Sequence, residues 1–171
     1  MTDPIEFPDD PGAFAARRPE PDPTDDAPVH AVGIGPGNLE YLTRRGARAI
    51  READVVVGFE TVVDFVQDEI TGEALTCGYR DEPEVLAEFA DRVAEGARGT
   101  AVLMGDPNHS GYQFVGKVES AVDAPVRVIP GISSLQIAAS RARTPMEETT
   151  FVTLHKSGPI EADLERLERD A

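Results

Sequence analysis

The sequence predicts an α/β fold, in which a mostly parallel sheet carries helices on both faces. The main observation is that three apolar runs each lead into a glycine-containing loop. These pairs are Val29–Val32 with Gly33–Gly37, Thr100–Met104 with Gly105–Pro107, and Val126–Ile129 with Pro130–Ser134. A short apolar run that ends in a turn is typical of a buried strand. Ligands of open α/β sheets bind beyond the carboxyl ends of the strands, so the loops predict one shared ligand site and an enzyme.

The first half of the folded region alternates between strands and helices. A helix is expected over Leu39–Glu52 because its apolar residues, beginning with Leu39 and Leu42, can share one face. Pro83 suits the start of a later helix, since the first turn does not use the N–H that proline lacks. The other expected elements are strands over Val29–Ile34, Asp54–Gly58 and Ala74–Cys77 and helices over Glu60–Gln67 and Glu84–Ala94.

The second half continues the same alternation. Thr100–Met104 is a strong strand candidate, and serine suits the N-terminus of the last helix of this half. Alternating strands and helices favour parallel pairing, because each helix returns the chain to the same end of the sheet. The expected elements after that strand are a helix over Tyr112–Ala121, a strand over Val126–Ile129 and a helix over Ser133–Arg141.

A new pattern begins after Pro145. Phe151–Leu154 is a candidate strand, and Ile160–Arg169 is expected to form a charged helix. A strand and one helix cannot bury a sheet face by themselves, so this segment either packs on the first domain or begins a second domain that is mostly absent. We therefore expect a domain over residues 29–147, followed by an incomplete second α/β domain over residues 148–171.

The N-terminal segment over residues 1–28 differs from the rest in composition. It holds seven of the 14 prolines and many acidic residues. It has few large apolar side chains that could offset the entropy cost of ordering it. We expect a disordered extension.

The charge of the chain is unusually negative. There are 32 acidic residues against 16 basic ones, a formal net charge of −16, and only Lys117 and Lys156 are lysines. Such a surface repels itself unless salt screens it, so the composition favours a halophilic protein; an ordinary protein with an acidic tail is the alternative. A nucleic-acid partner is disfavoured, because phosphate binding relies on clustered lysine and arginine.

Other compositional features point to a cytoplasmic protein. The chain has no apolar stretch near the roughly 20 residues that a membrane span needs, and Met1-Thr2-Asp3-Pro4 does not resemble a secretory signal. The single cysteine, Cys77, can form neither an internal disulfide nor a cysteine cluster for metal. The three histidines are too scattered for a metal site. His30 is expected to pack within its strand, and Cys77 and Tyr79 are interpreted as structural.

The first glycine loop resembles a dinucleotide-binding loop only superficially. Asn38 stands where the third glycine would be needed, and Val57-Gly58 stands where the second strand should end in an acidic residue. No Gly-Lys-Ser/Thr sequence of a Walker loop is present. By itself the loop could be no more than a tight turn from strand to helix.

The other two loops are chemically more specific. Asp106 and Pro107 bend the chain after a buried strand and expose a carboxylate and carbonyls, which suit a cation or an amino-acid group better than a phosphate. Ser133 and Ser134 add hydroxyls at a helix start. The alternatives are an Asx turn at Asp106 and a plain helix cap at the serines.

Taken together, these segments resemble the tetrapyrrole methylase family of S-adenosylmethionine-dependent enzymes, and most of all its cobalt-precorrin-7 (C5)-methyltransferase branch. The resemblance extends from Val29 to about Lys156. The C5 branch is indicated by the Ile-Ser-Ser-Leu-Gln run and the late Leu-His pair. The motifs that carry it are Val32–Gly37, Tyr41–Thr43, Ala53–Gly58, Gly105–Pro107, Ile129–Gln136 and Thr153–His155.

The resemblance implies a methyl donor, S-adenosylmethionine, in a cleft between two α/β domains. It implies contacts to this donor from Pro36, Gly105, Asp106, Pro107, Ser133 and Ser134. It implies substrate contacts from Gly35, Gly37, His109 and Lys156, and a catalytic role for His155 as proton acceptor or hydrogen-bond partner. Asn38 replaces a frequent aspartate, and Lys156-Ser157 replaces a frequent Gly-Arg pair.

The implied reaction methylates C5 of cobalt-precorrin-6B to give cobalt-precorrin-7 in cobalamin biosynthesis. The alternatives are another member of the family, such as a different precorrin methylase or diphthine synthase, and a truncated remnant without activity. The substrate would be an anionic tetrapyrrole, any cobalt would belong to it, and homodimers are common among relatives. Basic candidates for its carboxylates are Arg44, Arg45, Arg80, Lys117 and Lys156.

Overall fold

The computed structural model describes residues 29–109, 111–154 and 159–170, and the chain forms two compact units. Unit 1 ends at Ser134 and unit 2 begins at Leu135. The division falls ahead of residue 147, where we expected the first domain to end. The expected extension over residues 1–28 lies outside the described residues.

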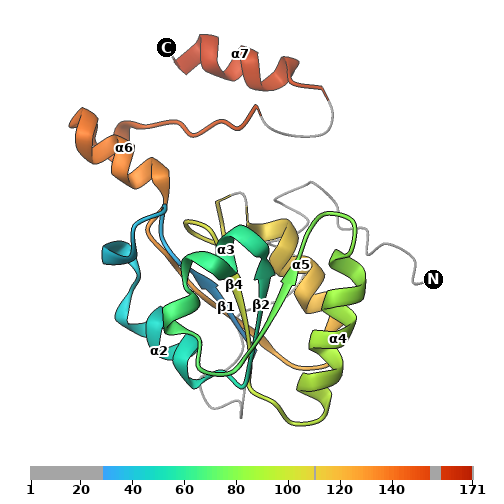
Figure 1. Ribbon diagram of the computed structural model, residues 1–171. Helices are drawn as coiled ribbons and strands as arrows, with labels where there is room; N and C mark the ends of the chain where they lie inside the picture. The colour runs from blue at the N-terminus through green and yellow to red at the C-terminus, as the bar shows by residue number, and fades with distance from the viewer. Residues whose placement is uncertain (1–28, 110, 155–158, 171) are drawn as a thin grey trace. The chain divides into compact units, whose positions relative to one another are not determined.

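Unit 1 is built on a five-stranded sheet in which every paired strand is parallel (Figure 1). The strand order is β3-β2-β4-β1-β5, so β1 lies between β4 and β5. This confirms the predicted mostly parallel sheet. The strands are β1 (Val29–Gly33), β2 (Val55–Phe59), β3 (Glu73–Cys77), β4 (Gly99–Leu103) and β5 (Val126–Ile129).

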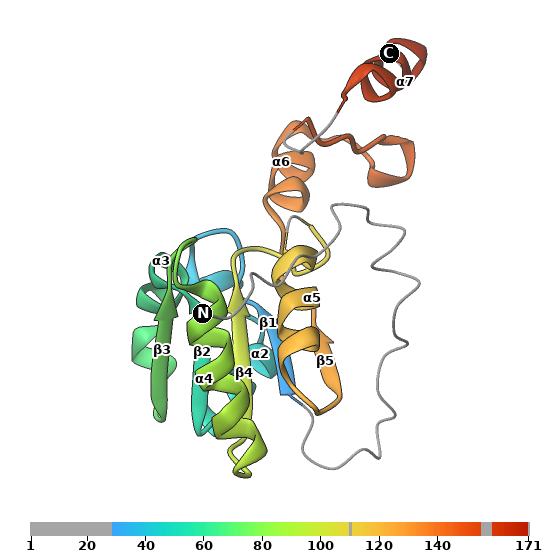
Figure 2. The ribbon, with the colours of Figure 1, turned by 90° about the vertical axis from the view of Figure 1, so that its right-hand side faces the viewer.

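Helices cover both faces of the sheet, as predicted. Residues of α2 (Arg44–Glu52) and α3 (Glu60–Phe65) share one buried apolar cluster with the sheet. Residues of α4 (Glu82–Ala94) and α5 (Tyr112–Ala121) share the cluster on the other face, and Figure 2 shows these two helices in front of the sheet. Because both faces are covered, the inner strands β2 and β4 are buried and almost entirely apolar, whereas most of the edge strand β3 is exposed.

The helix expected over Leu39–Glu52 is divided in the structure. Leu39–Tyr41 forms the short 3₁₀ helix η1, and α2 begins only at Arg44. The Thr43 hydroxyl oxygen accepts a hydrogen bond from the Gly46 N–H at 3.0 Å, which caps α2. A capping side chain stabilises a helix start, so the division has a local cause. Leu39 is 41% exposed and does not join the apolar face that its spacing suggested.

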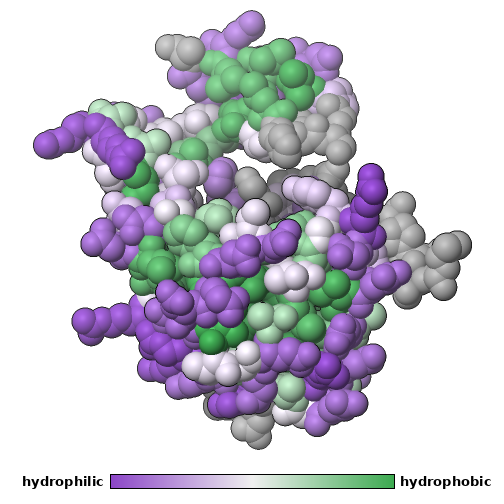
Figure 3. All heavy atoms as spheres, in the orientation of Figure 1, coloured by the Kyte–Doolittle hydropathy of each residue, from purple (hydrophilic) through white to green (hydrophobic). Residues whose placement is uncertain are grey.

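A second difference concerns the end of the chain. Phe151–Leu154 does not form the expected strand, and the described residues of unit 2 contain no strand. They contain α6, which begins at the unit boundary (Ser134–Ala142), the 3₁₀ helix η3 (Met146–Glu148) and α7 (Glu161–Asp170). Phe151, Leu154, Leu164 and Leu167 are exposed, and Figure 3 shows apolar side chains gathered on the part of unit 2 that carries α7.

Two smaller results complete the fold. The helix expected over Glu60–Gln67 ends at Phe65 and is followed by a 3₁₀ turn, η2 (Gln67–Glu69). Among the described residues, no helix is both long enough and apolar enough to cross a bilayer.

Candidate functional site

The loops after β1 and β4 are joined directly through their backbones. The Gly35 N–H donates to the Gly105 carbonyl at 3.2 Å, and the Gly105 N–H donates to the Gly35 carbonyl at 2.8 Å. This reciprocal pair extends the parallel sheet beyond its carboxyl edge by one antiparallel bridge. The two predicted glycine loops therefore lie side by side.

The loop after β5 joins the same group through Asp106. The Asp106 Oδ2 atom accepts a hydrogen bond from the Gly131 N–H at 3.0 Å. An added Cβ at Gly131 would collide with the Gly105 carbonyl oxygen, and one at Gly33 would lie 2.5 Å from that oxygen. Only glycine permits backbones to approach this closely. All three predicted loops meet at one place.

Asp106 also orders its own loop. Its Oδ1 atom accepts a hydrogen bond from the Asn108 N–H at 2.9 Å, and its carbonyl accepts one from the His109 N–H at 3.0 Å. The turn is therefore an Asx turn, as the alternative interpretation proposed, and its carboxylate also holds Gly131. A carboxylate has about four acceptor positions, so two backbone hydrogen bonds leave capacity for a further donor.

The other residues predicted to contact the methyl donor differ in how deeply they are buried. Pro107 and Ser133 are buried, Pro36 is half-buried and Ser134 is exposed at the start of α6. A Cβ added at Gly105 would lie 3.9 Å from the Ser133 Cα atom, which brings Ser133 next to the Asp-Pro loop.

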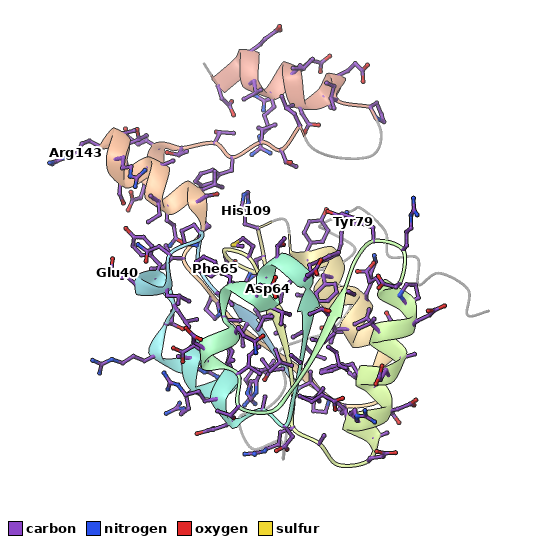
Figure 4. The ribbon with its side chains drawn as sticks, viewed as in Figure 1. Glu40, Asp64, Phe65, Tyr79, His109 and Arg143 are labelled. Atoms are coloured by element: carbon purple, nitrogen blue, oxygen red, sulfur yellow. The ribbon has the colours of Figure 1, made fainter. Side chains whose placement is uncertain are left out.

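The predicted substrate and catalytic residues are only partly described. Gly35 is buried, whereas Gly37 is exposed. His109 is half-buried, and in Figure 4 it projects from the end of unit 1 at which the glycine loops lie. His155 and Lys156 lie outside the described residues.

One basic candidate for the substrate has a different partner. The Lys117 ammonium on α5 donates to the Glu82 carboxylate on α4 at 2.5 Å. Glu82 is buried and Lys117 is half-buried. Lys117 was one of several candidates for a substrate carboxylate, and in the structure its charge joins two helices.

The sequence interpretation also missed a stack of aromatic rings. The Tyr79 and Phe59 ring centroids are 5.1 Å apart, and those of Phe59 and Phe114 are 5.3 Å apart. Tyr79 is 90% exposed. Phe59 ends a buried strand and Tyr79 follows the neighbouring strand, which is the signal that could have placed them together.

Two titratable groups outside the loops have environments that suit packing. Burial lowers the pKa of His30, and the nearby Arg127 and Arg45 act in the same direction. Burial and the carboxylates of Glu82 and Asp81 raise the pKa of Cys77 to about 12, so this thiol is a poor nucleophile at neutral pH. The described residues hold no group of three or more histidine, cysteine or acidic side chains able to bind a metal ion.

Comparison with known proteins gives a family match that includes all of the described residues. The family described as tetrapyrrole (corrin/porphyrin) methylases matches residues 28–171. A probable cobalt-precorrin-7 C(5)-methyltransferase from Methanocaldococcus jannaschii is 34% identical over 129 residues, covering 74% of this chain and 60% of the relative. A cobalt-factor III methyltransferase from Priestia megaterium is 31% identical over 125 residues, covering 67% of this chain and 23% of the relative.

The solved structures that resemble this chain include one with a bound product of the methyl donor. It is a uroporphyrin-III C-methyl transferase from Thermus thermophilus, complexed with S-adenyl homocysteine. It is 28% identical, with a TM-score of 0.53, and the match covers 66% of this chain and 48% of that one. The chain thus spans only part of the length of each of these proteins.

Proposed function

The chain belongs to the tetrapyrrole (corrin/porphyrin) methylase family, and from this premise we propose that it transfers a methyl group from S-adenosylmethionine to a tetrapyrrole of cobalamin biosynthesis. The finer proposal is methylation of C5 of cobalt-precorrin-6B to give cobalt-precorrin-7. One observation carries the proposal: the three glycine loops meet through the Gly35–Gly105 backbone pair and the Asp106–Gly131 hydrogen bond. Support for the C5 step comes from the relative of that name and from the Ile132–Gln136 run.

The residues at this point fit the donor that the family uses. Pro36, Gly105 and Asp106 are half-buried, so a ligand can reach them. Gly105 has no side chain, which leaves its backbone atoms open to contact. The donor carries a positive sulfonium and an ammonium group, both of which favour carbonyl and carboxylate oxygens. Asp106 supplies the negative charge, and its remaining acceptor capacity suits the ammonium.

In the proposed mechanism, the protein orients the reactants and supplies no covalent nucleophile. S-adenosylmethionine would supply the methyl: a meso carbon of the macrocycle forms the new C–CH₃ bond, the S–CH₃ bond breaks with its electron pair staying on sulfur to give S-adenosylhomocysteine, and the methylated macrocycle releases one proton to solvent. Alignment of this kind can contribute about 7–11 kcal/mol to lowering a barrier. The Gly105–Pro107 loop and Ser133 would hold the donor, whereas His109 would face the substrate. His155 and Lys156 are proposed on the resemblance alone.

A second candidate is a different step of the same chemistry. The cobalt-factor III methyltransferase is nearly as similar to this chain as the C5 relative. Because two relatives with different substrates are similar to this chain to nearly the same degree, the comparisons support the methyl-donor site more strongly than any particular methylated carbon. Both candidate functions use the same proposed donor site in this chain and differ only in the tetrapyrrole that is methylated.

Two measurements test the proposal. The first is calorimetric titration of the full chain with S-adenosylhomocysteine, comparing wild type with Asp106→Ala and with Asp123→Ala, an exposed aspartate before β5. We expect binding that only Asp106→Ala weakens. Absence of binding by the wild type, or equal binding by Asp106→Ala, would contradict the proposed donor site.

The second measurement identifies the substrate. The full chain is incubated with S-adenosylmethionine carrying a ¹³C methyl and with either cobalt-precorrin-6B or cobalt-factor III. We expect a labelled methyl on C5 of cobalt-precorrin-6B, located by NMR. Methylation of cobalt-factor III alone would select the second candidate. Donor binding without methylation of either would indicate that this chain is inactive by itself.

A further inference from the structure

Tyr79 is the most exposed large hydrophobic residue of the described chain, yet it is firmly supported. Its side chain is 90% exposed, while its ring packs at a tilt of 49° on Phe59. Phe59 packs in turn on Phe114, which is buried in the core between the sheet and α5. The three rings form an aromatic stack that runs from the core to the surface.

The turn that carries Tyr79 is also fixed. The Asp81 Oδ1 atom accepts a hydrogen bond from the Gly78 N–H at 2.7 Å, which closes the turn around Tyr79 and Arg80. The next residue, Glu82, begins α4 and is held by Lys117. The Phe59 ring packs against Tyr79, and the turn around it is closed by the Gly78–Asp81 hydrogen bond. The exposed Tyr79 ring therefore has little conformational freedom left to lose on binding a ligand.

The aromatic stack stands at the same end of the sheet as the glycine loops. Phe59 is the last residue of β2, and Tyr79 lies two residues beyond the end of β3. The strand order places β3 two strands from β4, and strands are about 4.8 Å apart, so the stack stands roughly 10 Å from the Asp-Pro loop. In Figure 4, Tyr79 and His109 lie at the same end of unit 1.

Arg80 adds a charge suited to a carboxylate. It is exposed and makes no ion pair with the described residues, whereas the Asp81 carboxylate beside it accepts from the turn. Lys117, another basic candidate from the sequence, forms an ion pair with Glu82. A guanidinium can bind a carboxylate through two hydrogen bonds, which favours a carboxylate-bearing ligand.

We propose that Tyr79 is a stacking platform for the conjugated part of the substrate macrocycle and that Arg80 binds one of its carboxylates. The inference rests on the proposed function for the identity of the ligand as a polycarboxylate tetrapyrrole. An aromatic face next to a guanidinium that has no ion pair within the described part of the chain matches the two features of such a ligand, a conjugated ring and peripheral carboxylates. The separation from the donor loops is comparable to the width of a macrocycle, so the platform holds the ring beside the donor and leaves the donor's own contacts unchanged.

The test uses uroporphyrin III, a porphyrin with eight carboxylates, as the probe. Its binding to the full chain is followed by the Soret absorbance, and S-adenosylhomocysteine binding is measured on the same samples by calorimetry. The variants are Tyr79→Ala, Tyr79→Phe and Arg80→Gln. Arg48→Gln, which removes an exposed arginine from α2, is the charge-matched control.

We expect Tyr79→Ala to weaken porphyrin binding about tenfold, which corresponds to about 1.4 kcal/mol, because the variant loses the stacked aromatic contact. Tyr79→Phe keeps the ring and should bind within about twofold of wild type. Arg80→Gln should weaken binding several-fold, and Arg48→Gln should leave it unchanged. Melting curves check that each variant is folded, which the exposure of Tyr79 favours.

Three results would overturn the inference. They are a wild type that does not bind the porphyrin, a Tyr79→Ala variant that binds it as well as wild type does, and a Tyr79→Ala variant that loses S-adenosylhomocysteine instead. The last result would assign the platform to the adenine of the donor. Porphyrin binding that depends on Tyr79, in a chain that never binds S-adenosylhomocysteine, would support the platform and contradict the proposed function, so the two failures are distinguishable.

Discussion

The carboxylate of Asp106 accepts a hydrogen bond from the Gly131 N–H at 3.0 Å and thereby ties the loop after β4 to the loop after β5. The same carboxylate accepts from the Asn108 N–H at 2.9 Å. Asp106→Ala removes both acceptors and should lower the free energy of unfolding by about 1–3 kcal/mol, mainly because the part-buried Gly131 N–H loses its partner. Urea denaturation of wild type and variant measures this loss.

Asp106→Asn separates the two hydrogen bonds. An asparagine side chain keeps one acceptor oxygen, so one of the two backbone donors retains its partner. The loss of stability should lie between those of wild type and Asp106→Ala. Asp123→Ala controls for removal of a negative charge. Equal stability of wild type and Asp106→Ala would show that the carboxylate does not hold the loops together.

Gly131→Ala tests how tightly the loops are packed. A Cβ at this position would meet the carbonyl oxygen of Gly105 and lie 2.7 Å from the carbonyl carbon of Gly33. Both neighbours are backbone atoms, so relief requires the loops to move apart. We expect destabilisation of about 1–3 kcal/mol, the usual range for overpacking, together with weaker S-adenosylhomocysteine binding. A variant that keeps wild-type stability would contradict the close approach of the three loops.

Gly37→Ala separates a binding role from backbone strain. Gly37 has φ of +95° and nothing within 4 Å of an added Cβ, and Gly96 in the turn after α4 has φ of +100° and equally open surroundings. Alanine at either position should therefore cost a similar amount of stability, about 1 kcal/mol. If Gly37 lies against the substrate, only Gly37→Ala should also weaken uroporphyrin binding. Equal binding by the two variants would remove Gly37 from the proposed site.

The parts of this fold that could be predicted from sequence follow from local patterns. Apolar runs such as Val55–Val57 mark buried strands, because helices cover both faces of the sheet. The meeting of the glycine loops was also predictable, because parallel strands end at the same edge. The Asx turn at Asp106 was foreseen as an alternative, but its hydrogen bond to Gly131 was not.

The parts that failed depend on competition or on distant contacts. The helix expected from Leu39 is interrupted because Asn38 and Thr43 hydrogen-bond to nearby N–H groups, which competes with helix propagation. The Glu82–Lys117 pair joins residues 35 positions apart, a relationship that no local pattern records. Tyr79 was interpreted as structural, but its side chain is 90% exposed, and its place beside Phe59 depends on contacts between separate strands.

Lys117→Met tests the ion pair between α4 and α5. Removing the ammonium leaves the Glu82 carboxylate buried and without its partner, which typically costs about 3–5 kcal/mol. The double variant Glu82→Leu/Lys117→Met removes both charges and should recover most of that stability, since apolar residues can replace a buried pair. Thermal melts of wild type, Lys117→Met, Glu82→Leu and the double variant measure the coupling. Additive effects of the two substitutions would show that the charges do not depend on each other.

The loss of stability at acid pH tests the ion pair between Asp54 and Arg98, which stand just before β2 and β4. Arg98 donates to both carboxylate oxygens of Asp54, at 3.0 and 2.9 Å, and holds the pKa of Asp54 at about 2. The unfolded carboxyl binds its proton near its ordinary value of 3.8, before the folded one does. The stability from this pair is therefore complete above about pH 4 and is lost as the pH falls towards 2.

Asp54→Asn cannot titrate, so it should be less stable than wild type at neutral pH by an amount that shrinks between pH 4 and pH 2. Urea denaturation at closely spaced pH values measures the difference between the two proteins. Asp64→Asn, at an exposed aspartate that forms no ion pair with the described residues, controls for the loss of one negative charge. A difference between wild type and Asp54→Asn that stays constant down to pH 2 would mean that Arg98 does not hold the carboxylate ionised. In that case the starts of β2 and β4 would be held together by backbone pairing, through the hydrogen bond from the Asp54 N–H to the Arg98 carbonyl at 2.9 Å.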